Sequence, residues 1–321
     1  MTYFFTPWLR RVIVAITFLA CFLPLFSLAN EMPLDGISAT GITIKEENNI
    51  QIEKENLYIS NDKIEVSYVF RNDTDKDIIT EVAFPIPQHF YDPTGHIKHY
   101  PVLSDFKVIV NGKEQKYNVR TRALLGDKDY TSLLNELKIS IRDFGDENRF
   151  YRKLSKIDQK KLLDLGLVSD EPRSRKMPEW AVETIYYWTQ SFPANSTTRI
   201  KHTYEPIPSF RLHYVSPSRG VKELSNSLCV NQEELISWIK KENQGILPLN
   251  ERFSINTIDY ILTTANHWKR PIKEFHLIID GKAWRASSCF EKSKLKRINE
   301  HSIEITINDF APQEEIEVFF F

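Results

Sequence analysis

Alternation of polar and apolar residues is the commonest pattern along the chain. Residues 63–70, Lys-Ile-Glu-Val-Ser-Tyr-Val-Phe, alternate polar and apolar as far as Tyr68, which is the period-two pattern of a half-buried β-strand. The polar cluster at 72–77 predicts a turn, and residues 78–84 predict the returning strand. Pro85 and Pro87 predict the end of that strand, because proline has no N–H to give to the ladder.

A second hairpin is signalled by its turn residues. The apolar run 106–110 leads into Asn111-Gly112, the pair that favours a two-residue type I′ turn, and 117–120 is the expected partner strand. Further strands are predicted at 183–192, 198–204, 211–215 and through most of 253–321.

The pattern becomes helical between about residues 123 and 177. Ser155 to Asp158 resembles a capping box, and Gly166 stands where the following helix would end. We interpret this segment as a helical insertion into a β domain. A second capping pattern, Asn231 to Glu234, predicts one short helix later in the chain.

Two segments of the chain repeat each other. Residues 101–113 and 271–282 each run from a proline through a phenylalanine and an apolar strand to an Asn-Gly or Asp-Gly turn. The hairpins that begin at 187–193 and 305–312 also correspond. Two copies of one β unit would explain both matches, and independent use of the same hairpin chemistry is the alternative.

The expected fold is therefore mainly β, with two β-sandwich-like modules. Residues 30–210 would form the first module, which carries the helical insertion. Residues 211–321 would form the second, with one short helix.

The first residues have a different character. Arg10 and Arg11 precede the apolar run 12–25, and Ser27-Leu28-Ala29 follows it. This is the pattern of a secretory signal peptide at 1–29, and the run is short for a bilayer span. A retained N-terminal anchor is the alternative. With cleavage after Ala29, no transmembrane segment is expected, and the protein would reach the periplasm or the cell surface.

Composition and charge exclude few classes. Hydrophobic residues at 41% and charged residues at 26% are ordinary for a globular protein. The formal net charge is −1, so no strong field of one sign favours nucleic acid.

Two cysteines remain after the leader. Cys229 and Cys289 are an even pair in an oxidising compartment, which predicts one disulfide. Two free buried thiols or a redox pair are the alternatives, although no Cys-x-x-Cys spacing is present.

Several segments together resemble a known family. They are 57–60, 64–70, 75–77, 82–87, 186–194, 202–206, Trp268, 275–280, Cys289 and 309–312. They are similar to a family of exported bacterial proteins known as domain of unknown function 4424. The resemblance implies a bacterial, periplasmic or surface protein and carries no catalytic residues. One departure is that Thr40-Gly41 is followed by Ile42 where members tend to have a second glycine. More remotely, the order of N-terminal elements is similar to vault and inter-alpha-trypsin-inhibitor type β domains, which are generally binding or structural modules.

Three histidines are candidate metal ligands. His89, His96 and His99 lie in one segment and could ligate zinc or copper if they converged. Their spacing matches no closed metal site, and a surface turn is the alternative. No cofactor is otherwise indicated.

Three aromatic residues are candidates for stacking on a ligand. Tyr186 and Trp188 share one face of a predicted strand, and Trp180 lies close by. Aromatic rings of this kind stack on sugars or peptides, and core packing is the alternative.

No nucleophile elbow, zinc-protease helix, phosphate loop or dinucleotide fingerprint is present. We therefore expect a non-catalytic binding or interaction protein, whose partner would be an envelope protein or a glycan. A metal-dependent or hydrolytic envelope enzyme using the His89–His99 segment is the alternative. The sequence does not identify the ligand or the oligomeric state.

Overall fold

The computed structural model describes most of the chain from Met32 onward. The described residues are 32–38, 41–44, 47–90, 103, 105–142, 149–169, 176–206, 208–214, 220–242 and 252–321. The expected signal peptide at 1–29 lies outside them. Among these residues, no helix has both the length and the apolar character needed to cross a bilayer.

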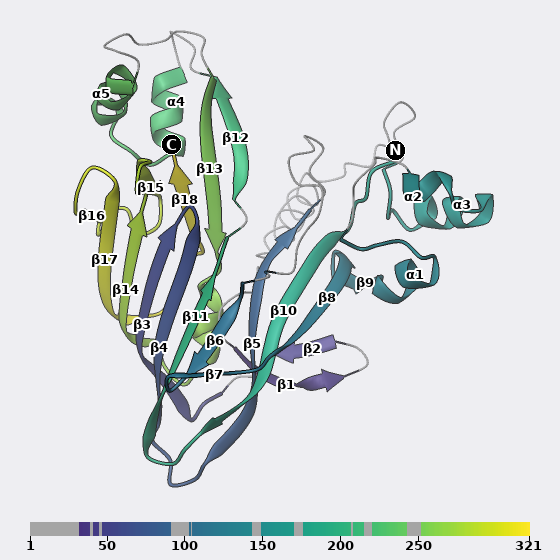
Figure 1. The fold of residues 1–321 in the computed structure, drawn as a ribbon, viewed down its shortest axis with the longest axis horizontal. Helices are drawn as coiled ribbons and strands as arrows, with labels where there is room; N and C mark the ends of the chain where they lie inside the picture. Colours follow the sequence, from purple (N-terminus) through teal and green to yellow (C-terminus); the bar gives the residue numbers. More distant parts are fainter. Residues whose placement is uncertain are drawn as a thin grey trace, which may run out of the picture.

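Strands dominate the regular structure, which confirms the mainly β prediction (Figure 1). The strands are β1 (Met32–Ser38), β2 (Gly41–Ile44), β3 (Ile50–Ser60), β4 (Lys63–Asn72), β5 (Ile78–His89), β6 (Lys107–Val110), β7 (Lys113–Glu114), β8 (Asn118–Leu125), β9 (Lys128–Asp129), β10 (Ala181–Phe192), β11 (Ser196–Tyr204), β12 (Ser209–Tyr214), β13 (Arg252–Tyr260), β14 (Ile272–Asp280), β15 (Ala286–Ser288), β16 (Lys296–Arg297), β17 (Ser302–Phe310) and β18 (Ile316–Phe320). The helices are α1 (Thr131–Glu136), α2 (Arg149–Arg152), α3 (Lys156–Asp164), α4 (Gly220–Ser227), α5 (Gln232–Glu242) and the 3₁₀ helix η1 (Thr263–His267).

In the described part of the chain, the strands form sheets of eight, six and four strands. The eight-stranded sheet has the order β16-β17-β14-β3-β4-β11-β6-β7. The six-stranded sheet has the order β2-β1-β5-β10-β8-β9, and the four-stranded sheet has the order β12-β13-β18-β15.

The two smaller sheets pack on the same inner face of the eight-stranded sheet. One hydrophobic cluster contains Ile64 and Phe275 from the eight-stranded sheet, Trp188 from the six-stranded sheet and Val318 from the four-stranded sheet. Each of these side chains is at most 2% exposed. The molecule is therefore a sandwich whose first layer is continuous and whose second layer is divided in two.

The two halves of the chain meet at β3 and β14. These strands pair in parallel, from Lys54 opposite Glu274 to Ser60 opposite Asp280. Each predicted module thus has its own second-layer sheet and shares the first layer with the other module. The division of the chain into modules at 30–210 and 211–321 stays a prediction.

The Asn-Gly turn is formed, but its predicted partner strand is wrong. Asn111 and Gly112 have φ values of 48° and 79°, as a type I′ turn requires. The strand that returns is β7, whereas 118–125 is β8 of the six-stranded sheet. After Glu114 the chain passes from the eight-stranded sheet to the six-stranded sheet. The polar and apolar pattern of the two strands does not show which sheet each one joins.

The prediction that prolines end the strand after residue 84 is also wrong. Pro85 lies opposite Ile185 of β10, and β5 runs on to His89. On its other side β5 pairs with the described residues of β1 from Glu81 to Ala83. Pro85 and Pro87 have no described partner on that side, and a missing N–H costs little where no ladder needs it.

The strands of the proposed repeat pair differently. In the eight-stranded sheet β6 pairs with β11, whereas β14 pairs with β17 and β3. The two turn glycines also serve different needs. Gly112 supplies a positive φ, while a Cβ on Gly281 would collide with the carbonyl oxygen of Trp284. The internal repeat stays a prediction.

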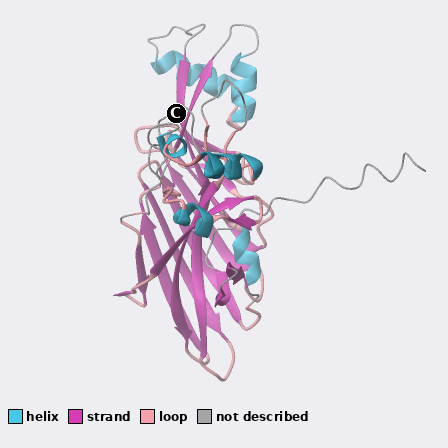
Figure 2. Ribbon diagram, turned by 90° about the vertical axis from the view of Figure 1, so that its right-hand side faces the viewer, coloured by secondary structure: helices cyan, strands magenta, loops and turns pink. Residues whose placement is uncertain are grey.

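Helices α4 and α5 lie beyond one end of β12 and β13, and α1 to α3 lie to the side of β8 and β9 (Figures 1 and 2). Helices α1 to α3 occupy the predicted insertion, and Ser155 caps α3 by accepting a 3.1 Å hydrogen bond from the Asp158 amide. Asn231 caps α5 by accepting from the Glu233 amide at 2.8 Å. Helix α4 precedes α5, so the second half has two α-helices where the sequence predicts one.

Candidate functional site

The three aromatic candidates are core residues. Tyr186 and Trp188 are 0% and 2% exposed and lie between the layers, where the Tyr186 ring stacks on Phe106 at 4.1 Å between centroids. Trp180 is 1% exposed in the core of the helical insertion, and its indole N–H donates to the Ile141 carbonyl at 3.2 Å. These rings have no face accessible to a ligand.

The histidine candidates are not brought together by the described structure. His89 is half-buried at the end of β5, and burial lowers the pKa of its imidazole to about 4. His96 and His99 lie outside the described residues. Within the described ranges, no three His, Cys, Asp or Glu residues gather closely enough to hold a metal ion.

The predicted disulfide is formed. Cys229 and Cys289 are bonded and close a loop with a sequence separation of 60. Cys229 lies between α4 and α5, and Cys289 follows β15. The bond therefore fastens the helical pair to the four-stranded sheet.

Several polar side chains are buried between the layers. Glu55 and His202 are 0% exposed, and the hydroxyl groups of Tyr68 and Tyr260 lie 3.2 Å apart. The His202 ring is surrounded edge-on by Phe84 at 5.0 Å and other aromatic rings. This cluster belongs to the interior of the sandwich and offers no accessible site.

The outer face of the eight-stranded sheet has an irregularity that three neighbouring strands share. Each strand places two consecutive polar residues on the outside, between residues that face the core. The pairs are Glu53-Lys54 on β3, Lys273-Glu274 on β14 and Asn308-Asp309 on β17. The register of β3 with β4 shifts between Ile52 and Lys54, as at a β-bulge, and Asp309 on β17 has a φ of 49°. Bulges of this kind redirect side chains and are frequent beside functional sites.

The three polar pairs form a cleft, which we call the bulge cleft. Its volume is about 440 Å³, and it is lined by Glu53, Lys273, Glu274, Asn308 and Asp309. The register places Glu274 between Lys54 of β3 and Asn308 of β17. The cleft therefore lies at the junction of the two halves of the chain.

Some charged side chains of the bulge cleft have close hydrogen-bond or ion-pair partners, and others do not. Lys54 Nζ lies 2.6 Å from Glu274 Oε1, and this hydrogen bond lowers the pKa of the Glu274 carboxyl. Lys273 Nζ is 4.0 Å from Glu53 Oε1, the outer limit of an ion pair, and the Lys273 side chain is 63% exposed. The side chains of Asn308 and Asp309 have no hydrogen bond or ion pair with another described side chain.

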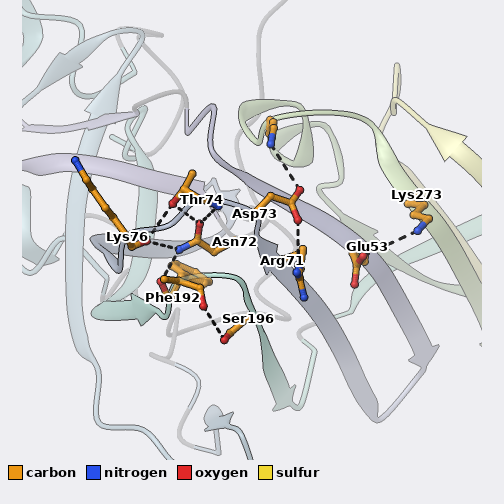
Figure 3. Close-up of polar contacts among 11 residues, drawn as sticks. Glu53, Arg71, Asn72, Asp73, Thr74, Lys76, Phe192, Ser196 and Lys273 are labelled. Carbon is orange, nitrogen blue, oxygen red and sulfur yellow. Dashed lines mark hydrogen bonds and ion pairs between the residues drawn. The ribbon is translucent and has the colours of Figure 1, made fainter.

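A hydrogen-bonded turn lies near the Glu53–Lys273 pair of the bulge cleft, with Arg71 and Asp73 between them (Figure 3). Asn72 Nδ2 donates to the carbonyl oxygens of Lys76 and Phe192 at 2.8 and 2.9 Å. Its Oδ1 accepts from the Thr74 amide and hydroxyl at 2.9 and 2.7 Å. The turn after β4 and the turn after β10 are thereby fixed to each other.

Ion pairs continue from this turn toward the cleft. Asp73 accepts from Arg71 at 3.0 Å and lies 3.7 Å from Lys269 Nζ. Figure 3 shows this group next to the Glu53–Lys273 pair. Arg71 lies opposite Gln51 on β3, two residues before Glu53. Strand β3, which carries Glu53 of the cleft, is therefore held by its neighbour β4 and the ion pairs of Arg71 and Asp73.

A second, shallower groove lies beside the disulfide. It is lined by Cys289, Glu291, Lys292, Ser293 and Glu314, with a volume of about 710 Å³. Its charged side chains come from turns and partly satisfy each other, as in the 2.8 Å ion pair of Lys294 with Glu291. The bulge cleft is the better candidate, because strands hold its side chains in place.

Sequence reasoning missed the bulge cleft, although a signal was present. Residues 272–275 and 307–310 each read apolar, polar, polar, apolar, which interrupts the strict alternation of a strand. On β3 the signal is hidden, because the inward residue after the pair is itself polar, Glu55. The three interruptions come together only through the β3–β14 pairing.

A protein-family model matches residues 32–319 and is described as Domain of unknown function (DUF4424). The chain belongs to the DUF4424 family. No curated protein matches this DUF4424 chain.

Two solved structures match the chain at low identity and with low TM-scores. A candidate nutrient-binding protein from Legionella pneumophila is 13% identical with a TM-score of 0.43, and the match covers 91% of this chain and 70% of that one. An M1 zinc metallopeptidase from Deinococcus radiodurans is 9% identical with a TM-score of 0.24. That match covers 85% of this chain and 43% of the metallopeptidase.

Proposed function

We propose that this DUF4424 protein is exported to the bacterial envelope and binds a ligand, without catalysis, at the bulge cleft. The observation that carries the proposal is the alignment of three outward polar pairs on adjacent strands. Sites built on strands hold side chains more rigidly than sites on loops. Two of the lining side chains, Asn308 and Asp309, leave their polar groups available to a ligand.

The charges of the cleft suit binding better than acid–base chemistry. A general acid or base works best when its pKa lies near the operating pH. Lys54 instead lowers the pKa of Glu274, so that this carboxylate stays ionised at neutral pH. Charged groups on an open sheet face attract and orient a ligand.

Export is tested by locating the mature N-terminus. Full-length protein with a C-terminal tag, expressed in a Gram-negative host, is fractionated and its N-terminus sequenced. We expect it in the periplasmic fraction, starting near Asn30. Recovery of the intact leader in the cytoplasm would contradict the proposed location.

Binding is tested by exposing the purified mature protein to the small molecules of a periplasmic extract and measuring retained mass by native mass spectrometry. We expect the wild type and Glu304→Gln to retain a species that the double variant Lys273→Gln, Asp309→Asn loses. Glu304 is a matched control, because it lies on the same outer face and pairs with His276 instead of lining the cleft. Equal retention by all three proteins, or no retention by any, would refute binding at the cleft.

A further inference from the structure

We propose that the ligand of the bulge cleft is a small zwitterion with an ammonium group beside a carboxylate, the chemistry of a free α-amino acid. This inference rests on the proposed function and specifies the class of ligand. It follows from which charges in the cleft already have partners and which do not.

Asp309 and Glu53 carry carboxylates in the cleft, on the strands to either side of β14. The Asp309 carboxylate has no partner among the described side chains, and Glu53 has only the distant Lys273 ammonium at 4.0 Å. An ammonium group carries three donors and forms charge-assisted hydrogen bonds with carboxylates. A ligand ammonium would therefore bind at Asp309, the carboxylate without a partner, while Glu53 stays beside Lys273.

Lys273 and Asn308 provide the hydrogen-bond donors of the cleft. The Lys273 side chain is 63% exposed and only loosely engaged, so it can turn toward a ligand carboxylate. The Asn308 amide can donate a second hydrogen bond to the same group. Lys54 is not available for this role, because Glu274 holds it at 2.6 Å.

The spacing of Lys273 and Asp309 matches a compact dipolar molecule. The register pairs Ile272 with Phe310 and Glu274 with Asn308, which places Lys273 and Asp309 across from each other on neighbouring strands. Facing side chains on paired strands have Cβ atoms roughly 5 Å apart. The opposite charges of the cleft are therefore neighbours, as are the two charges of an α-amino acid.

Ligands with a single charge fit less well. A simple cation would lie beside the Lys273 ammonium, and a simple anion would lie beside the Glu53 and Asp309 carboxylates. Like charges at such short range repel and reduce affinity. A zwitterion satisfies both kinds of charge and leaves neither without a partner.

The test uses isothermal titration of the purified mature protein with glycine and L-alanine, and with methylamine and acetate as single-charge comparators. We expect the two amino acids to bind at least about tenfold more tightly than either comparator. Asp309→Asn and Lys273→Gln should each weaken amino-acid binding about tenfold, whereas Glu304→Gln should change it less than about twofold. Circular dichroism and thermal melts of each variant confirm that the fold is kept.

The possible results separate the two proposals. Retention of an extract species at the cleft, combined with no binding of glycine or L-alanine, would refute the zwitterion class and leave the binding function standing. Methylamine or acetate binding as tightly as the amino acids would refute the class as well. Absence of both extract retention and amino-acid binding would refute both proposals.

Discussion

Tyr58 donates a 2.7 Å hydrogen bond from its hydroxyl group to Asp280 Oδ2, and thereby connects two parallel strands that are more than two hundred residues apart in sequence. Asp280 also accepts from Ser302 of β17 at 3.1 Å and from the Lys282 amide at 3.0 Å. Burial opposes ionisation of Asp280, yet these hydrogen bonds hold the pKa of its carboxyl below the usual range. The Tyr58–Asp280 hydrogen bond therefore joins the two halves of the chain near the C-terminal ends of β3 and β14 in the eight-stranded sheet.

Replacing Tyr58 with phenylalanine should lower the free energy of unfolding by about 1 kcal/mol, the usual net value of such a hydrogen bond. Urea unfolding of the wild type and Tyr58→Phe measures the difference. Tyr187→Phe is a control, because Tyr187 lies on β10, away from this junction. No difference between Tyr58→Phe and the wild type would mean that the Tyr58–Asp280 hydrogen bond does not stabilise the junction.

The same pair predicts a dependence on pH. Burial first, and then the hydrogen bond to Asp280, raise the pKa of Tyr58 from 10.0 to about 12. Because the folded pKa is the higher one, the contribution of Tyr58 to stability is complete below pH 10 and is lost as the pH rises through about 12. The stability difference between wild type and Tyr58→Phe should therefore shrink from pH 10 to pH 12. A constant difference over this range would contradict the assignment.

Glu234 of α5 lies between two arginines of the second half. It pairs with Arg285, whose side chain is 11% exposed, and with Arg297 at 3.3 Å. Burial, and then the charge of Arg297, lowers the pKa of Arg285. Glu234→Gln would leave two neighbouring cations without their carboxylate and should cost about 2 kcal/mol.

The matched control for Glu234→Gln is Glu233→Gln. Glu233 precedes it on the first turn of α5, is exposed and has no ion pair with another described residue. Chemical unfolding should show a change below about 0.5 kcal/mol for this variant. Equal effects of the two substitutions would indicate a general charge effect on the helix and not a specific one.

The disulfide should stabilise the second half strongly. Closing a loop with a separation of 60 residues is worth about 4 kcal/mol by chain entropy. We expect Cys229→Ser with Cys289→Ser to lower the midpoint of guanidinium unfolding, and dithiothreitol to do the same to the wild type only. If dithiothreitol destabilised the double variant to the same extent, the effect would not come from this bond.

Asn72 should be critical for the turn near the bulge cleft. It is 1% exposed and takes part in four hydrogen bonds with the two adjoining turns. Asn72→Ala should cost about 3 kcal/mol, because the carbonyl and amide groups it satisfies would lose their partners. Asn118→Ala, at an exposed position of β8, should change thermal stability little. A small effect at Asn72 would show that water replaces its hydrogen bonds.

Local features of the fold were predictable where nearby residues decide them. The Asn111-Gly112 turn follows from the ease with which asparagine and glycine adopt positive φ. The caps at Ser155 and Asn231 follow from short side chains that reach the amides two or three residues ahead. In each case the partner lies within a few residues, so the pattern contains the whole interaction.

Other features depended on partners that are distant in sequence. The end of β5 was wrongly predicted at Pro85, because the cost of proline depends on whether a neighbour strand needs its N–H. Aromatic residues such as Trp180, Tyr186 and Trp188 occur both in cores and on binding surfaces, so the local sequence does not tell the two apart. Packing between the layers and within the helical insertion places these three in the core.

The amino-acid sequence by itself determined the mainly β class, the helical insertion, the disulfide pair and the family, since each depends on local periodicity or on matching segments. Only the tertiary structure decided that β3 and β14 lie side by side, and therefore that the polar pairs at 53–54, 273–274 and 308–309 form one cleft. The physical reason is that strands pair through backbone groups, which are common to nearly all residues. The order of strands in a sheet depends on which faces become buried together, and the sequence of a single strand does not specify its neighbours.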